Sequence, residues 1–380
     1  MGGKAGVCLR GDEDSVEDWG NVRGPVTQKT CSDGAGRLMA WGSAEMQGWR
    51  ESMEDAHLVL PSLREAVVSE NCKLDVDLGW DRISLFGVMD GHGGFQVAKF
   101  CERHLPSAIA VRSSADPAAA MAQSFVEMDE LLQEPEGLKE LRRLSALAKS
   151  ARSRRQTAEG MGCTVVLSCV TPTSLIVANA GDSRAVLCRN GQALDLSQDH
   201  KPDLPNERAR IESAGGWIEG GSILRVNGDL SLSRAVGDLE YKDRRLPPER
   251  QIVTASPDVR VVARQPQDEF MLLACDGVWD VLSSQAAVDF LRKELGDRNS
   301  WAPRLASGQL RLSELLCRLL DQCLSPDLRL TDGLGGDNMT AVLVLFLPML
   351  VTAQSALAGC TRAVRAVGPP WLPTTIRAAS

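Results

Sequence analysis

The chain has 380 residues, of which 43% are hydrophobic and 24% are charged, values ordinary for a soluble globular protein of one large or two ordinary domains. Its formal net charge of −8 does not favour a nucleic-acid partner. The longest apolar run, residues 341–351, is too short to cross a bilayer and contains Pro348, so we expect no integral membrane segment.

The 11 cysteines are scattered singly without a CxxC pair, which excludes zinc-ribbon spacing. Cys169 and Cys275 lie inside apolar runs, where a reduced thiol behaves as a small hydrophobic side chain. We therefore expect a reducing compartment, the cytoplasm first and the nucleus as a second location.

Residues 1–37 are polar and Gly-rich without periodicity, so we expect a flexible leader, with ordered structure beginning near Leu38. The leader contains no apolar signal segment. Gly2 could accept myristate, but Gly6 stands where Ser or Thr is preferred, so membrane association through Gly2 has only weak support.

The first polar cluster of the ordered region combines Arg50, Glu54, Asp55 and His57 within eight residues. Such a mixture is costly to bury unless it is paired or metal-bound. Arg50 could offer its planar fork to an oxyanion such as phosphate, while Glu54 or Asp55 faces a cation. The alternative is a solvated loop with a surface ion pair, and the residues alone do not separate the two interpretations.

A short buried strand is predicted over residues 84–89, and it leads into Asp90-Gly91-His92-Gly93-Gly94. Three glycines in five residues allow a sharp turn and a close approach to a ligand. A carboxylate and an imidazole at this turn favour a hard cation and a proton donor. In the alternative, Asp90 merely caps the helix expected over 95–110.

A second helix is predicted over residues 118–132, followed by a strongly basic stretch over 139–155. Arg142-Arg143-Leu144-Ser145 in this stretch is similar to a basophilic kinase target, but we favour a solvated insertion loop, residues 139–158.

The middle of the chain predicts antiparallel sheet. Residues 162–170 and 174–179 form a hairpin pattern, and strand 185–188 leads to an Asn190-Gly191 turn. Asp182 falls in a turn of this sheet, where an Asx turn is its alternative role.

The next elements are a helix over 206–214 capped by Asn206, a hairpin of strands 223–226 and 230–232, and a polar, exposed flap over 239–251.

The last third repeats the design of the Asp90 turn. An apolar strand over 269–275 ends in Asp276-Gly277 and is followed by Asp280, and Gly336-Asp337 precedes a strand over 339–347. Ser283 or Ser284 should cap a helix over 285–295, and another helix is expected over 310–324. The weakly patterned tail, 349–380, is interpreted as an appendage.

Three strand-edge aspartates, Asp90, Asp276 and Asp337, can therefore meet at one sheet edge. Converging carboxylates repel one another unless a divalent cation neutralises them. All-oxygen ligation suits Mg²⁺ or Mn²⁺, and the small number of His argues against zinc. Two such ions about 3.5–4 Å apart could bridge a water, lower its pKa and direct the hydroxide at a phosphoryl group. Arg50 would hold the phosphate, and His92 would protonate the leaving group.

The sequence resembles the type 2C metal-dependent Ser/Thr protein phosphatase (PPM) family. The resemblance covers about residues 38–348 and rests on seven motifs in the family's order: GWRESMEDAH, FGVMDGHGG, ANAGDSRAV, DHKPD, NGDLSLSRAVGDLEYK, LLACDGVWDVLS and GGDNMTAVLV. It implies an α+β fold, a four-layer α-β-β-α sandwich of two antiparallel sheets flanked by helices.

The resemblance also implies residue roles. Asp90 would bridge two Mg²⁺ or Mn²⁺ ions, the Gly91 carbonyl and Glu54 would serve the second ion, and Asp276 and Asp337 would complete the first. Asp55 would support Glu54, and Asp182 and Asp280 match positions linked to a weaker third ion. Arg50 would bind substrate phosphate, His92 would be the general acid, and the flap would influence substrate choice.

Phosphorylated proteins are the substrates that the resemblance implies, and we expect a monomer. Cys163 replaces the family's usual Ser, but every matched metal or phosphate residue is intact. Two further hypotheses remain: a catalytically silent binding module on the same fold, and a hydrolase of small phosphate esters.

Overall fold

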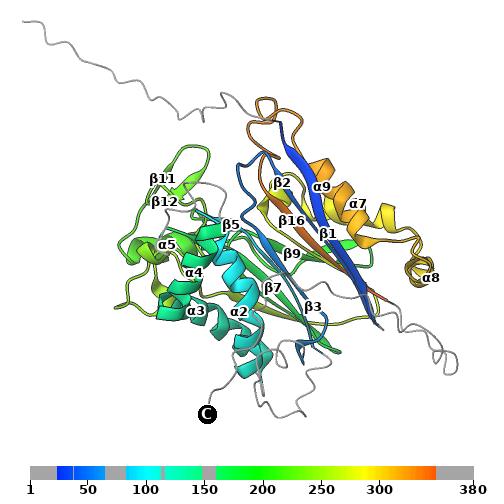
Figure 1. The fold of residues 1–380 in the computed structure, drawn as a ribbon, viewed down its shortest axis with the longest axis horizontal. Coiled ribbons are helices and arrows are strands. Elements are labelled where there is room, and N and C mark those ends of the chain that lie inside the picture. The colour runs from blue at the N-terminus through cyan, green and yellow to red at the C-terminus, as the bar shows by residue number, and fades with distance from the viewer. Residues whose placement is uncertain (1–23, 37, 65–82, 113–115, 148–159, 348–380) are drawn as a thin grey trace, which may run out of the picture. The chain divides into compact units, whose positions relative to one another are not determined.

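The computed structural model describes residues 24–36, 38–64, 83–112, 116–147 and 160–347 (Figure 1). The expected tail, 349–380, the Gly2 region and the basic residues 148–158 lie outside the described residues. Among the described helices, none is both long and apolar enough to cross a membrane.

Two antiparallel sheets form the centre of the fold. The first has the order β1-β2-β16-β15-β9-β10. Its strands are β1 (Val26–Ala35), β2 (Met39–Gly48), β9 (Arg184–Arg189), β10 (Gln192–Asp195), β15 (Asp268–Ala274) and β16 (Met339–Phe346).

The second sheet has the order β14-β8-β7-β4-β3. Its strands are β3 (Ala56–Leu60), β4 (Ser84–Met89), β7 (Val165–Val170), β8 (Ser174–Ala180) and β14 (Asp258–Ala263).

Side-chain alternation along these strands separates the layers. In β15, Met271 and Leu273 point into the core between the two sheets, whereas Phe270 and Leu272 pack toward the helices. In β4, Phe86 likewise belongs to the core between the sheets, and its neighbours face the other side. The central strands β4, β7, β15 and β16 are buried on both faces, so their sequences are almost continuously apolar.

Helices cover the two outer faces (Figure 1). Those on the second sheet are α2 (Gln96–Arg112), α3 (Pro117–Gln133) and α4 (Pro135–Leu147). Those on the first sheet are α7 (Ser284–Leu295), α8 (Trp301–Ala306) and α9 (Leu312–Cys323). The predicted four-layer α+β sandwich is confirmed.

Two short sheets and several short helical pieces complete the described fold. Two short sheets consist of β5 (Gly91–His92), β6 (Gly162–Cys163) and β13 (Val236–Gly237), and of β11 (Ile218–Gly220) and β12 (Leu224–Val226). The remaining helical pieces are α5 (Pro205–Ser213), α6 (Asp276–Trp279), η2 (Leu239–Tyr241), η3 (Pro248–Arg250) and η4 (Arg298–Ser300).

Four sequence predictions need correction, and the first concerns the leader. The leader over residues 1–37 is wrong for Val26–Ala35, which form strand β1. This strand is mostly exposed and pairs with β2 through its backbone. It therefore has little apolar periodicity from which it could be recognised.

The solvated loop predicted from residue 139 is also wrong as far as Leu147, because α4 continues through it. Leu141 and Leu144 of this helix are buried in a segment that otherwise carries charges.

The hairpin partner of residues 224–226 is β11, and Leu230 forms only an isolated bridge with Val226. Finally, α5 begins at Pro205, so Asn206 does not cap it. The Ser283 cap of α7 is confirmed, since its hydroxyl accepts from the Ala286 N–H at 3.2 Å.

Candidate metal centre and active site

The first half of the site is the turn that follows β4. Asp90 comes directly after the strand, and its backbone carbonyl accepts a hydrogen bond from the Thr164 N–H at 2.8 Å. A Cβ on Gly91 would lie 2.3 Å from the Glu54 carbonyl oxygen, so only glycine allows this approach. The close contact holds the Glu54 segment against the Asp90 turn.

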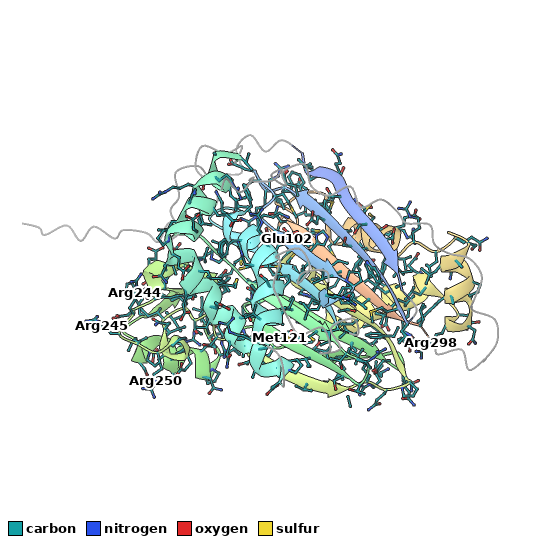
Figure 2. All side chains as sticks on the ribbon, turned by 60° about the horizontal axis from the view of Figure 1, so that its bottom comes forward. Glu102, Met121, Arg244, Arg245, Arg250 and Arg298 are labelled. Carbon is teal, nitrogen blue, oxygen red and sulfur yellow. The ribbon has the colours of Figure 1, made fainter. Side chains whose placement is uncertain are left out.

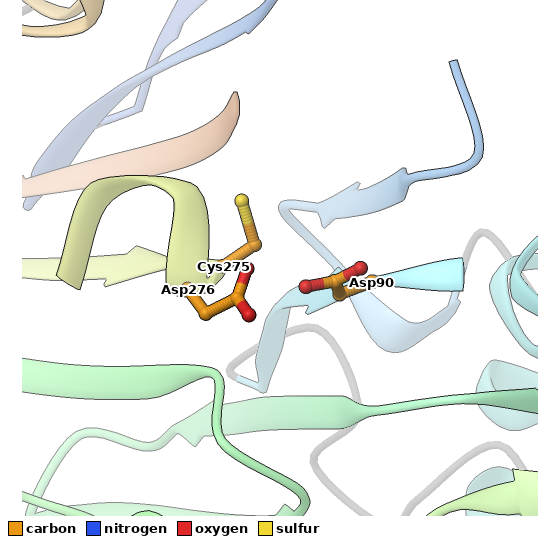
Figure 3. A group of neighbouring side chains, drawn as sticks. All are labelled: Asp90, Cys275 and Asp276. Atoms are coloured by element: carbon orange, nitrogen blue, oxygen red, sulfur yellow. The ribbon is translucent and has the colours of Figure 1, made fainter. Parts of the chain in front are cut away.

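The second half is the start of α6, where β15 delivers Asp276 to the same place. Ligand atoms of Asp90, Cys275 and Asp276 all lie within 4.8 Å of one another, and the two carboxylates face each other (Figure 3). Two residues 186 positions apart in sequence (276 − 90) are thus neighbours at one end of the sandwich.

Cys275 belongs to this cluster by distance rather than by chemistry. It is fully buried, and its Sγ accepts from the Thr340 N–H at 3.1 Å. Burial raises the pKa of the thiol well above its ordinary value, and the nearby charges of Asp55 and Asp90 raise it further. The side chain is therefore a protonated thiol, as expected for a packing residue.

Asp337 enters the site just before β16 and forms an ion pair with Arg50, 2.6 Å from Nη2 to Oδ2. The next residue, Asn338, fixes the loop that carries Arg50 and Glu54. Its Oδ1 accepts from the Glu54 N–H at 2.8 Å, and its Nδ2 donates to the Gln47 and Ser52 carbonyls. The two strands β2 and β16 are thereby tied together where their functional residues emerge.

The carboxylates perturb one another. Loss of solvent raises the pKa of Asp90 well above its ordinary value, with further increases from Asp55, Asp337 and Asp182. The pKa of Asp276 is raised well above its usual range by the same loss of solvent, followed by the charge of Asp90. Burial raises the pKa of Asp55 to about 7. Such a cluster is unfavourable when fully ionised without a compensating cation.

His92 faces an unexpected partner. Its Nε2 lies 2.7 Å from Oδ2 of Asp238, a residue that is only 2% exposed. Loss of solvent lowers the pKa of His92, but the charge and hydrogen bond of Asp238 outweigh this effect and leave the pKa raised. Asp238 itself adopts a left-handed backbone, with φ of 48°. This pair favours the protonated imidazole.

Asp182 lies in the turn between β8 and β9, as predicted. Its Oδ2 accepts from the Lys201 ammonium at 2.6 Å. The pKa of Lys201 is raised, because the attraction of Asp182 outweighs the lowering effect of burial. Lys201 thereby holds the Asp182 side chain in place at the cavity wall.

A cavity of about 660 Å³ brings the predicted residues together. Eight of them line it: Arg50, Glu54, Asp90, Gly91, His92, Asp182, Asp276 and Asp337. Two do not. Asp55 is buried and accepts from the Thr340 hydroxyl at 2.7 Å, while Asp280 is exposed at the end of α6.

The donor set fits a hard divalent cation. Within the described part of the chain, three buried carboxylate oxygens accept no hydrogen bond: Oδ1 of Asp55, of Asp182 and of Asp276. Buried polar atoms are normally satisfied, and an ion is one explanation for such exceptions. Oxygen ligands of this kind suit Mg²⁺ or Mn²⁺.

Sequence reasoning missed three residues: Asp238, Asn338 and Lys201. Each lies inside a motif, but no local spacing connects it with its partner. Asp238 is 146 residues from His92, and Asn338 is 284 residues from Glu54. The only available signal was that each residue belongs to a motif, and membership of a motif does not identify the partner.

Known proteins resemble the chain over this whole region. A family model described as "Protein phosphatase 2C" matches residues 39–325. "Probable protein phosphatase 2C 11" of Oryza sativa subsp. japonica is 40% identical over 358 residues, covering 85% of this chain and 89% of the relative. "Probable protein phosphatase 2C 2" of Paramecium tetraurelia is 41% identical over 330 residues, covering 84% and 96%.

Solved structures agree on the fold. A phosphatase from a pathogenic strain of Toxoplasma gondii superposes with a TM-score of 0.61 at 24% identity, covering 84% of this chain and 96% of the other. A serine-threonine phosphatase 2C from Toxoplasma gondii gives 0.60 at 22% identity, covering 84% and 99%.

Proposed function

Since the chain belongs to the protein phosphatase 2C family, we propose that it hydrolyses phosphoserine and phosphothreonine in protein substrates and requires Mg²⁺ or Mn²⁺. The observation that carries the proposal is the convergence of Asp90 and Asp276 in a cavity that Arg50 and His92 also line.

The proposed ligands of two ions are the carboxylates of Asp90, Asp276 and Asp337, the Gly91 carbonyl, and Glu54. The buried Asp55 supports this group, and Asp182 with Asp280 forms a weaker third position. Bound divalent cations would offset the repulsion between the carboxylates and supply the lowered pKa that an attacking water needs.

Arg50 positions the phosphoryl group. Its guanidinium stands at the cavity edge with 61% of the side chain exposed, and a planar fork matches two phosphate oxygens. Substrate phosphate would compete with Asp337 for this fork. Arg50 thereby holds the phosphorus in place for attack.

His92 supplies the proton that the leaving alkoxide needs. In the charged ring the Nε2–H donates a hydrogen bond to Oδ2 of Asp238, which keeps the ring oriented and favours its charged form. The second proton of the charged ring, on Nδ1, is then the one given to the leaving oxygen.

Substrate choice is assigned in part to the flap, residues 239–251. Arg244, Arg245 and Arg250 project from one end of the structure (Figure 2), and all three are exposed. Tyr241 of the same flap lines the cavity, so the exposed guanidiniums of this segment favour substrates with acidic residues near the phosphorylated one. The monomeric state and the cytoplasmic or nuclear location remain predictions.

A substrate panel tests the proposal. We expect purified protein with Mn²⁺ to release phosphate from phosphothreonine and phosphoserine peptides with a higher kcat/KM than from a phosphotyrosine peptide or a small aryl phosphate. A clear preference for the small ester would favour the small-ester hydrolase. No turnover of any substrate by folded, metal-loaded protein would favour the silent binding module.

A further inference from the structure

Two cysteines that the proposed mechanism does not use lie where the edge of the first sheet packs against its helix layer. Cys31 lies in the edge strand β1, and Cys317 lies in α9, which packs beside that strand (Figure 1). Both are free thiols; Cys31 is exposed and Cys317 is partly exposed.

The register of strand and helix places these thiols in one row of contacts. Lys29 pairs with Asp321 at 2.5 Å, and Asp33 accepts from the Ser313 N–H at 2.8 Å. Alternate strand residues 29, 31 and 33 therefore match helix residues 321, 317 and 313, which are four apart. Alternate strand positions share a face, as do helix positions four apart, so the central pair is held between two fixed ones.

The two thiols also influence each other's chemistry. Burial raises the pKa of Cys317, and the neighbouring Cys31 side chain raises it further. The exposed Cys31 is thus the thiol that a solvent oxidant reaches first, with Cys317 as the partner that resolves the product.

We propose that Cys31 and Cys317 form a reversible disulfide, which fastens the edge strand β1 to α9 when the protein meets a peroxide. The Cys31 sulfur takes a hydroxyl from hydrogen peroxide and releases one water, which gives a sulfenic acid. The Cys317 sulfur then displaces that hydroxyl as a second water and forms the S–S bond. Two thiols and one peroxide become one disulfide and two waters, and a dithiol reductant reverses the change.

The first sheet connects the proposed disulfide to the candidate active site. Strand β1 pairs with β2, which ends just before Arg50, and β2 pairs with β16, which starts just after Asp337. An edge strand is held on one side only and opens easily. A covalent link over a long loop restricts the unfolded chain, so oxidation should stabilise this sheet.

A second cysteine pair provides an internal control. The Sγ atoms of Cys101 and Cys163 are 3.7 Å apart, but both side chains are fully buried. Burial raises the pKa of Cys163 well above its ordinary value. Distance alone would predict a disulfide here too, whereas access and ionisation predict none in the folded protein.

The test treats the full chain with hydrogen peroxide, blocks the remaining thiols, digests with trypsin without reductant and measures masses. We expect peptide 30–37 joined to peptide 312–318 with the loss of two hydrogens, and we expect dithiothreitol to remove the product. Cys31→Ser and Cys317→Ser should each abolish it and retain phosphatase activity. The linked peptide's absence from oxidised, folded wild type, or its formation only together with a Cys101–Cys163 product, would overturn the proposal.

A thermal melt supplies an independent readout. We expect oxidation to raise the Tm of wild type by several degrees and to leave the Tm of Cys31→Ser unchanged. If oxidation raised the Tm of both proteins equally, the proposed bond would be contradicted, whatever the Tm of the reduced variant.

Discussion

Nη2 of Arg50 lies 2.6 Å from Oδ2 of Asp337, so the proposed phosphate-binding residue pairs with a proposed metal ligand. The pair joins the end of β2 to the start of β16, and Arg50 remains 61% exposed. An exposed ion pair contributes little to stability and can exchange partners readily. Arg50 can therefore turn to substrate phosphate at small cost.

Replacing Arg50 should weaken substrate binding. Because hydrogen bonds to charged groups contribute about 1.5–3 kcal/mol, Arg50→Ala should lower kcat/KM for a phosphothreonine peptide roughly 10- to 150-fold, mainly through KM. Arg50→Lys should recover only part of the loss, since a single ammonium cannot form the bidentate contact. Steady-state kinetics would check this, with the exposed Arg329→Ala as control. An unchanged KM in Arg50→Ala would remove the residue from phosphate binding.

Variants of His92 and of its partner Asp238 should lose activity with the same dependence on the leaving group. We expect His92→Ala to slow hydrolysis most for esters with poor leaving groups, because a good leaving group needs no proton. Asp238→Asn should show a weaker version of the same trend, since it leaves the imidazole in place but removes its charged partner. The measurement is log kcat against leaving-group pKa for both variants. A uniform loss across the series would contradict the general-acid role.

A buried network next to the site should determine acid stability. Glu207 contacts Arg210 and Arg234 at 2.6 and 2.7 Å and accepts from the Ser233 hydroxyl. Burial raises the pKa of Glu207, but the hydrogen bond from Arg234 and the charge of Arg210 outweigh it and lower the pKa from 4.5 to about 2. The resulting stability is present above the unfolded pKa and is lost as the pH falls through about 2.

Glu207→Gln should accordingly lower the free energy of unfolding at pH 7 by about 3 kcal/mol, since it leaves two arginines without their carboxylate. The difference from wild type should shrink as the pH falls from about 4.5 toward 2. Urea midpoints at pH 7 and pH 3 would show this, with the exposed Glu212→Gln of the same helix as control. A pH-independent difference would mean that packing, rather than charge, gives Glu207 its role.

The flap arginines should affect specificity more than rate. The double variant Arg245→Glu, Arg250→Glu should lower kcat/KM several-fold for phosphopeptides with acidic flanking residues and should reduce the salt dependence of that value. Peptides with neutral flanks should change little. The same charge change placed on the opposite helix layer, Lys293→Glu with Arg318→Glu, serves as control. Equal effects of the two double variants would mean that the net charge of the protein, rather than the position of the flap, causes the change in specificity.

Sequence reasoning placed the long buried strands and helices well because their side chains carry the signal. Residues 339–346 are apolar at almost every position, and α9 buries one face at helical spacing. Strand β1 lacked such a signal, because it is held by backbone pairing and by polar contacts with α9. For the same reason α4, which has two buried leucines among many charges, was mistaken for a loop.

The same distinction between local and long-range signals applies to the site. Asp90, Asp276 and Asp337 each adjoin an apolar strand and a glycine, so local sequence points to them. Local sequence does not identify the partner of His92, because Asp238 is 146 residues away and approaches His92 only in the folded chain. The same limit hid Asn338, whose contacts with Gln47 and Ser52 depend on the pairing of β2 with β16.

The most direct test of the account is phosphate release from a phosphothreonine peptide in EDTA and after excess Mn²⁺ or Mg²⁺ is restored. Wild type should be inactive in EDTA and should recover with metal, whereas Asp90→Asn should remain inactive with an unchanged circular dichroism spectrum. The exposed Asp289→Asn, with the same chemical change, should behave as wild type. Full activity in EDTA, or near-normal turnover by Asp90→Asn, would contradict the claim that these carboxylates hold the ions that the reaction requires.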